Sequence, residues 1–98
     1  MTELQQAYNA YLAALATYNS VYSARFQPEV VTIPAWPALA PGASDTCILS
    51  DILARTAFIT RATLCIVENV GNVQGAQDCI NYWHGICVAA IAGCVAQS

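Results

Sequence analysis

The fold is decided by residues 65–79, which read CIVENVGNVQGAQDC. A cysteine stands at each end of this stretch, and Val70-Gly71-Asn72 breaks its middle. Glycine adopts turn conformations that other residues avoid, and asparagine is a good N-cap for a helix that begins after it. The stretch therefore predicts two helices that meet in an antiparallel turn, with a disulfide between Cys65 and Cys79.

A second pair of cysteines fits the same arrangement. Facing residues of an antiparallel helical pair have residue numbers with a nearly constant sum. The numbers of Cys65 and Cys79 add to 144, and those of Cys47 and Cys94 add to 141. Each helix then carries its two cysteines about four or five turns apart on one face. We therefore predict a second disulfide, between Cys47 and Cys94, in a helical hairpin over residues 45–96.

Residues 2–24 have the spacing of a long amphipathic helix. Thr2 is a suitable N-cap, and Glu3 is favourable in the first turn. Large side chains recur at alternating intervals of four and three residues, which forms one continuous seam. The seam either faces the chain's own core or forms a subunit interface, where tyrosine is abundant. The candidate interface residues are Leu4, Tyr8, Tyr11, Leu15, Tyr18, Tyr22 and, further along the chain, Trp36.

A proline-rich connector over residues 27–44 follows. Proline lacks an amide donor and disfavours helix in the residue before it. At about 3.1 Å per residue, the extended connector reaches roughly 50 Å and can return along the whole bundle. The first two helices are then parallel, unless the connector carries the first helix to a neighbouring copy. Residues 29–33 have the composition of a short strand, and Trp36 is expected to anchor the connector on a helix. The prolines are Pro28, Pro34, Pro37 and Pro41.

The second predicted helix, residues 45–70, is apolar on nearly every side. Two of its ridges are expected to face the other helices of the chain. A three-helix monomer covers only two of the three apolar faces of this helix, and the face that remains predicts a partner. The third predicted helix, residues 73–95, is rich in glycine and alanine, which permits the close approach that disulfides require. One of the three apolar ridges of the second helix consists of Leu49, Leu53, Leu64 and Val67.

Composition argues against several classes of partner. Charged residues are 9% and hydrophobic residues 57% of the 98-residue chain, against about 25% and about 45–50% in ordinary soluble domains. The net charge is −3, and the only basic residues are three scattered arginines and no lysine. Nucleic acids and anionic membranes attract clustered positive charge, so neither is an expected partner. The chain is expected to form one domain.

The expected location follows from the cysteines and the hydropathy. The apolar stretch over residues 86–96 is too short to span a bilayer. Residues 1–6 lack the basic and apolar regions of a signal peptide, so we expect none. Paired cysteines are typical of an oxidising compartment, and we expect an extracellular or surface location.

Chemically active groups are few. Cys87 has no partner at the same index sum, so it is either a free thiol or forms an intermolecular disulfide. His84 and Cys87 are two ligands at most, whereas a structural zinc site needs about four. The carboxylates of Asp51 and its acidic neighbours are expected at helix caps or in solvent. We expect no catalytic residue, no metal and no cofactor.

These observations predict an all-α protein with a long N-terminal helix, an extended crossover and a disulfide-stapled helical hairpin. The low charge and the uncovered face indicate a structural, self-assembling subunit of an extracellular or surface fibre, layer or coat. Its expected partners are other copies of itself. The alternative hypothesis is a small helical carrier of a lipid or other apolar ligand, whose extra apolar surface lines a cavity.

Overall fold

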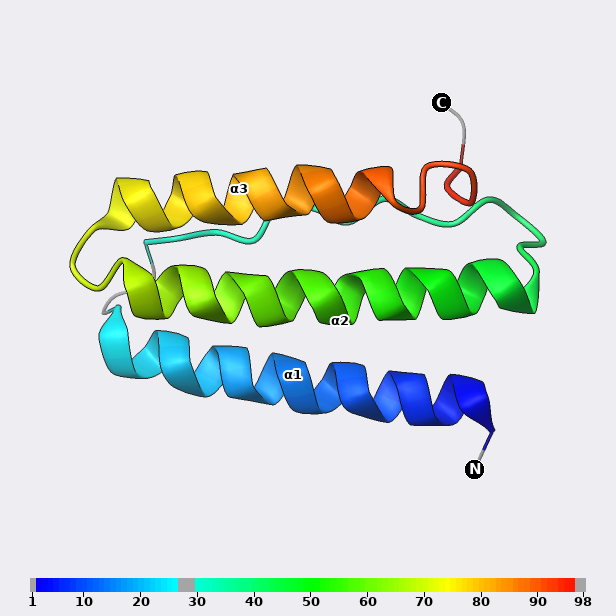
Figure 1. Ribbon diagram of the computed structural model, residues 1–98, viewed down its shortest axis with the longest axis horizontal. Coiled ribbons are helices and arrows are strands. Elements are labelled where there is room, and N and C mark those ends of the chain that lie inside the picture. The colour runs from blue at the N-terminus through cyan, green and yellow to red at the C-terminus, as the bar shows by residue number, and fades with distance from the viewer. Residues whose placement is uncertain (1, 27–29, 97–98) are drawn as a thin grey trace.

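The protein is all-helical within the described residues, 2–26 and 30–96, of a computed structural model. The helices are α1 (Glu3–Arg25), α2 (Asp45–Glu68) and α3 (Val73–Ala89), and no β-strand occurs in those two ranges. Figure 1 shows them as three rods side by side. The predicted all-α class is confirmed.

Each helix begins at a polar side chain that accepts a hydrogen bond from the backbone three residues later. Thr2 accepts from the amide of Gln5, and the Gln5 side chain accepts in return from the Thr2 amide, which completes a capping box. Ser44 caps α2 by accepting from the Cys47 amide, and Asn72 caps α3 by accepting from the Gly75 amide. These caps satisfy amides that have no partner inside the helix, so they set the three starting points.

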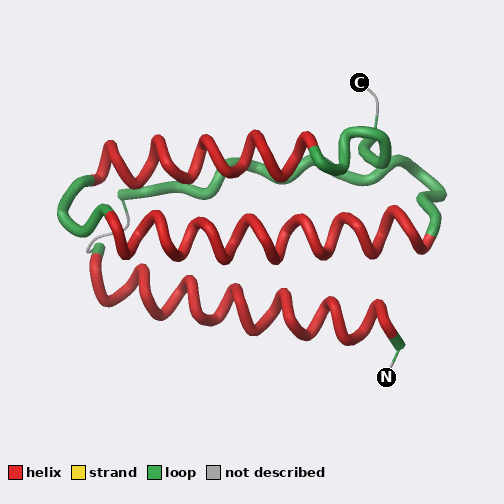
Figure 2. Tube along the Cα trace, viewed as in Figure 1, coloured by secondary structure: helices red, strands yellow, loops and turns green. Residues whose placement is uncertain are grey.

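Helix α2 lies in the middle of the molecule. It packs against α1 on one side and against α3 on the other. Figure 1 shows that α1 and α2 run parallel, whereas α3 runs antiparallel to α2. The connector returns along the length of the helices from the end of α1 to the start of α2 (Figure 2). The Cα trace measures 42 × 33 × 18 Å along its principal axes, so the protein is a thin slab.

Two disulfides join α2 to the chain that follows it. Cys65 and Cys79 are bridged near the α2–α3 turn, with their Cα atoms 5.7 Å apart. Cys47, in the first turn of α2, is bridged to Cys94, and these Cα atoms are 5.5 Å apart. The presence of two disulfides is confirmed, and the bridged residues are those that the index sums pair.

Helix α3 is shorter than predicted. It ends at Ala89, six residues before the expected end at Val95, and the following residues form tight turns with bonds such as Cys94 N–H to Ile91 O at 2.8 Å. The physical reason is that the chain end pairs with the connector. The Ala40 amide donates to the Cys94 carbonyl at 3.0 Å, and the Ala96 amide donates to the Ala38 carbonyl at 2.9 Å. Extended pairing of this kind is incompatible with continued helix.

The connector is extended but forms no strand over its described residues, 30–44. The predicted strand over residues 29–33 is therefore wrong for residues 30–33, and residue 29 lies outside the described part of the chain. An isolated antiparallel bridge joins Leu39 to Val95. Elsewhere the connector forms hydrogen bonds with side chains of the helices, because the backbone donors and acceptors inside a helix are already paired with one another.

The core lies where α1, α2, α3 and the connector meet. Its most completely buried large side chains are Phe58 and Ile66 of α2 and Ile80 of α3. Tyr22 of α1 and Phe26, the C-cap residue that follows this helix, stack within this cluster with ring centroids 5.5 Å apart. The described helices include none that is long and apolar enough to cross a membrane.

We expect removal of the Cys47–Cys94 bridge to destabilise the protein more than removal of the Cys65–Cys79 bridge. The bridged residues are 47 positions apart in the first case and 14 in the second. A longer cross-linked loop removes more entropy from the unfolded chain, which gives about 4 and about 3 kcal/mol respectively. Urea unfolding of the two double Cys→Ser variants measures this difference. Equal losses, or the reverse order, would contradict it.

Candidate functional site

The connector is fixed on the helices by a buried carboxylate. Trp36 donates from its indole nitrogen to the Asp51 carboxylate at 2.7 Å. Arg55, one turn later on α2, donates from Nε to the other Asp51 oxygen at 3.0 Å. Asp51 is 6% exposed, so the expectation that its carboxylate lies at a cap or in solvent is wrong. A buried carboxylate is tolerated here because both of its oxygens accept hydrogen bonds.

Aromatic rings enclose the same anchor. The Trp36 ring lies 5.7 Å from Phe58 and 5.7 Å, edge-on, from His84 of α3. The Arg55 guanidinium lies 5.4 Å from the indole centroid. His84 Nε2 is 2.9 Å from the Ala35 carbonyl oxygen, and since a carbonyl only accepts, this nitrogen carries the proton. The expected role of Trp36 as an anchor is thus seen in its contacts with both α2 and α3.

Tyr22 forms a second clamp on the connector. Its hydroxyl accepts from the amides of Val30 at 2.7 Å and Val31 at 2.8 Å, and donates to the Val31 carbonyl at 3.2 Å. Between the two anchors, the Gln77 side chain of α3 bonds both the amide and the carbonyl of Thr32 at 2.9 Å. One tyrosine hydroxyl and one glutamine amide therefore replace the sheet partners that this extended segment lacks.

This cluster holds the connector on α2 and α3. Asp51 is engaged by Trp36 and Arg55, and the proton on His84 Nε2 is engaged by the connector. Groups of three or more His, Cys, Asp or Glu side chains able to hold a metal do not occur among residues 2–26 and 30–96.

Cys87 is a free thiol on the inner side of α3. It is buried, and this burial raises the pKa of the thiol, while the positive charge of Arg61 opposes the shift. An intermolecular disulfide needs an accessible thiolate. Of the two sequence-based interpretations, the structure favours a buried free thiol.

The tyrosine seam of α1 is divided between the core and the surface. Tyr18 and Tyr22 are each 5% exposed and lie in the chain's own core, which corrects their placement in a subunit interface. Tyr11 and Leu15 are partly buried against that core. Leu4 is half-buried near the start of α2 and Tyr8 is 50% exposed, so these two remain at the surface.

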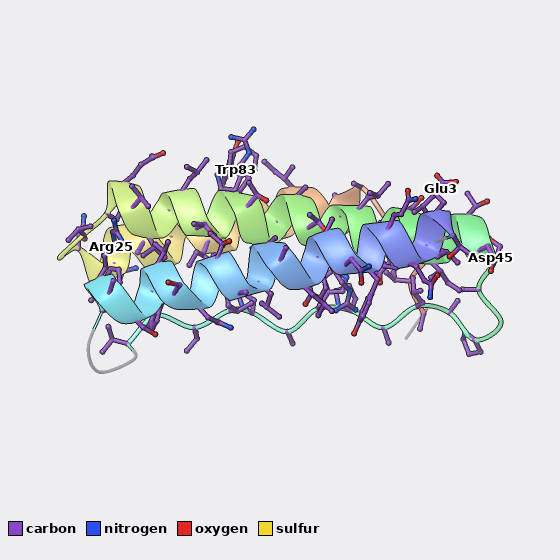
Figure 3. The ribbon with its side chains drawn as sticks, turned by 90° about the horizontal axis from the view of Figure 1, so that it is seen from below. Glu3, Arg25, Asp45 and Trp83 are labelled. Carbon is purple, nitrogen blue, oxygen red and sulfur yellow. A yellow bond between two sulfur atoms is a disulfide. The ribbon has the colours of Figure 1, made fainter. Side chains whose placement is uncertain are left out.

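The side of the slab opposite the connector is apolar, and we call it the open face. On α2, Leu53, Leu64 and Val67 lie about 140–160° around the helix from Asp51, which holds the connector. On α3, Tyr82 and Ile86 lie about 160° from His84 by the same geometry. In Figure 3, Trp83 projects from the upper side of the helices, and the connector runs along the lower side. The five residues of the open face are exposed by 54%, 42%, 44%, 62% and 44%, in chain order.

The open face also contains a groove between α1 and α2. It has a volume of about 240 Å³ and is lined by Ala14, Thr17, Thr60, Thr63 and Leu64. The three threonine hydroxyls donate to the carbonyls four residues earlier, at 2.9–3.1 Å. Because these hydroxyls are already bonded to the helix, the groove presents mainly methyl groups.

Sequence reasoning predicted that one apolar face of α2 stays uncovered but did not say which face, and it missed Asp51 and the Tyr22 clamp. An acidic side chain within a strongly apolar helix, four residues before an arginine, was the available signal for Asp51. Tyr22 had no such signal, since its hydroxyl partners belong to the connector backbone. The chain matches no protein-family model, no curated protein and no solved structure. Any inference about function therefore rests on the surface described above.

We expect Tyr22→Phe to destabilise the protein by about 1–3 kcal/mol, since it leaves the buried amide and carbonyl of Val31 without their partner. Tyr8→Phe is the matched control, because Tyr8 is half exposed on the same helix and its change should cost close to nothing. Urea unfolding of both variants makes the comparison. A Tyr22→Phe variant as stable as the control would show that the clamp contributes no stability.

Cys87 is expected to make stability depend on pH. The unfolded thiol ionises near its ordinary pKa of 9.0, whereas burial keeps the folded thiol protonated beyond that value. Its contribution is therefore complete below that pH and is lost as pH rises through the folded-state pKa. The unfolding free energy of the protein should fall relative to Cys87→Ala between about pH 8 and about pH 10. A difference that stays constant across this range would contradict the expectation.

Proposed function

We propose that this protein is a structural subunit that assembles with other copies of itself through the open face. The observation that carries the proposal is the exposure of five large apolar side chains on one side of a thin slab. Contiguous apolar surface of this kind marks an interaction site, because leaving it in water is unfavourable. The two disulfides support an oxidising setting, such as the outside of a cell or particle.

The chemistry of the face supports an apolar protein partner. Arg61 brings a positive charge to it, and its guanidinium lies 4.6 Å from the centroid of the Trp83 ring. The aromatic ring attracts the cation above it and so partly offsets the positive charge of the guanidinium. One such group lacks the clustered charge that nucleic acid or an anionic membrane requires. A mainly aliphatic face with an aromatic centre is instead typical of the buried part of a protein interface.

The carrier alternative has less support. The core is filled, with Ala62, Ile66, Ala76 and Ile80 each 0% exposed. A depression of about 370 Å³ between the starts of α1 and α2 is lined in part by Glu3 and Asp45. Carboxylates at its rim are unfavourable for an apolar ligand, which needs a mostly apolar pocket. The structure thus offers an apolar surface more readily than an apolar cavity.

We expect the protein to form particles whose mean mass rises with concentration, and Leu53→Asp/Leu64→Asp to prevent this. Both leucines are exposed, so the substitutions should leave the fold intact while placing two charges in the interface. Light scattering in non-reducing buffer measures the mass, and circular dichroism checks the fold.

The matched control is Ala16→Asp/Ser20→Asp. These residues stand two positions before and after the buried Tyr18 and therefore lie about 160° from it, on the outer edge of α1. The control adds the same two charges and should still assemble. A wild-type protein that stays monomeric at 10.4 kDa at every concentration would refute the proposed function. Stoichiometric uptake of an apolar dye by that monomer would favour the carrier.

A further inference from the structure

A second apolar surface lies on the opposite side of the slab, and we call it the connector face. Tyr8 and Leu12 of α1 are 50% and 44% exposed, and Val30 and Ile33 of the connector are 47% and 39% exposed. Tyr8 is nine residues from Thr17, so it lies about 180° around α1 from the groove of the open face. The slab therefore carries large exposed apolar side chains on both broad sides.

Each side is large enough for a stable contact. The slab extends over 42 × 33 Å, which bounds the footprint of either side at about 1,400 Å². A standard protein interface needs about 800 Å² per partner. A second copy of the chain has the dimensions to cover such a surface. If two copies paired only through their open faces, or only through their connector faces, the resulting dimer would still expose its other apolar faces to water.

The two faces differ in shape in a complementary way. On the connector face, Tyr8 and Leu12 stand one turn apart on α1 and form a ridge of large side chains. On the open face, the groove between α1 and α2 is lined by methyl-presenting Ala14, Thr17, Thr60 and Thr63. Ridges of large side chains pack into grooves between helices. The ridge of one copy therefore suits the groove of another.

Charge also favours contact between unlike faces. Two open faces in contact would bring two Arg61 guanidiniums into one apolar interface, where like charges are costly. The connector face instead offers aromatic rings, including Tyr8 and Tyr11, whose centroids are 6.4 Å apart. Its own arginine, Arg55, is paired with Asp51. When the open face of one copy lies on the connector face of another, Arg61 therefore meets aromatic rings. Among the described residues of the connector face, it meets no unpaired cation.

We propose that copies stack head to tail, with the open face of one copy on the connector face of the next. Each copy then has two neighbours, and the assembly grows as a stack with two free ends, as contacts between unlike faces do unless a rotation closes them. This inference rests on the proposed function, because it assumes self-assembly and specifies the second surface and the order of the copies.

The test uses two variants that each block one face. Leu53→Asp/Leu64→Asp blocks the open face, and Tyr8→Asp/Leu12→Asp blocks the connector face. All four positions are exposed, and circular dichroism with non-reducing intact mass verifies the fold and both disulfides. Leu12→Asp alone replaces the second variant if the double substitution unfolds.

Head-to-tail stacking predicts that each variant alone is a monomer and that an equimolar mixture forms a dimer of twice the monomer mass. In that dimer the intact open face of one variant binds the intact connector face of the other. Analytical ultracentrifugation of each variant and of the mixture gives these masses. A dimer formed by either variant alone would overturn the proposal, since it requires contact between like faces. Continued polymerisation of the connector-face variant would overturn it too. A monomeric wild-type protein would instead refute the proposed function itself.

Discussion

The structure depends on the return of the connector along two parallel helices. Because α1 and α2 run in the same direction, the chain between them must travel the length of the molecule outside any helix. The backbone groups of that segment need partners wherever water is excluded. Side chains supply them: the Tyr22 hydroxyl, the Gln77 amide and the Asp51 carboxylate hold three successive parts of the connector. Without these contacts the connector would have no sheet or helix to join, and the core beneath it would be exposed.

The disulfides and the helix starts could be predicted from sequence because they are local or obey simple arithmetic. An N-cap is recognised from one residue, and the bridge partners follow from a turn at Gly71 and the index sums. The end of α3 could not be predicted in this way. Its residues have no helix-breaking signal stronger than Gly93, and the helix stops because Ala38 and Ala40 of the connector bond the chain end. The end of α3 is therefore set by a tertiary contact, which the local sequence does not reveal.

The exposed apolar surface was predicted only in part. An uncovered apolar face on α2 could be predicted because a helix that is apolar on every side exceeds what two neighbours can cover. That this face is the ridge with Leu53, Leu64 and Val67 could not be predicted, because it depends on how α1 and α3 pack against α2. The division of the tyrosine seam was beyond a periodicity argument. Tyr8 and Tyr22 lie about 40° apart on one helix, yet Tyr22 is covered by the connector and Tyr8 is half exposed. Which tyrosine is buried depends on the path of the connector across α1, and helical spacing contains no information about that path.

The buried Cys87 thiol has a consequence for the integrity of the two bridges. Disulfides exchange when a thiolate attacks a bridging sulfur, and the rate depends on ionisation and on access. Cys87 is both buried and harder to ionise than an exposed thiol. In the folded protein it is therefore a poor attacker of Cys47–Cys94 and Cys65–Cys79, although a fifth cysteine in the unfolded chain offers several wrong pairings. Folding around Cys87 thus acts as a kinetic safeguard that preserves the correct pairing once it has formed.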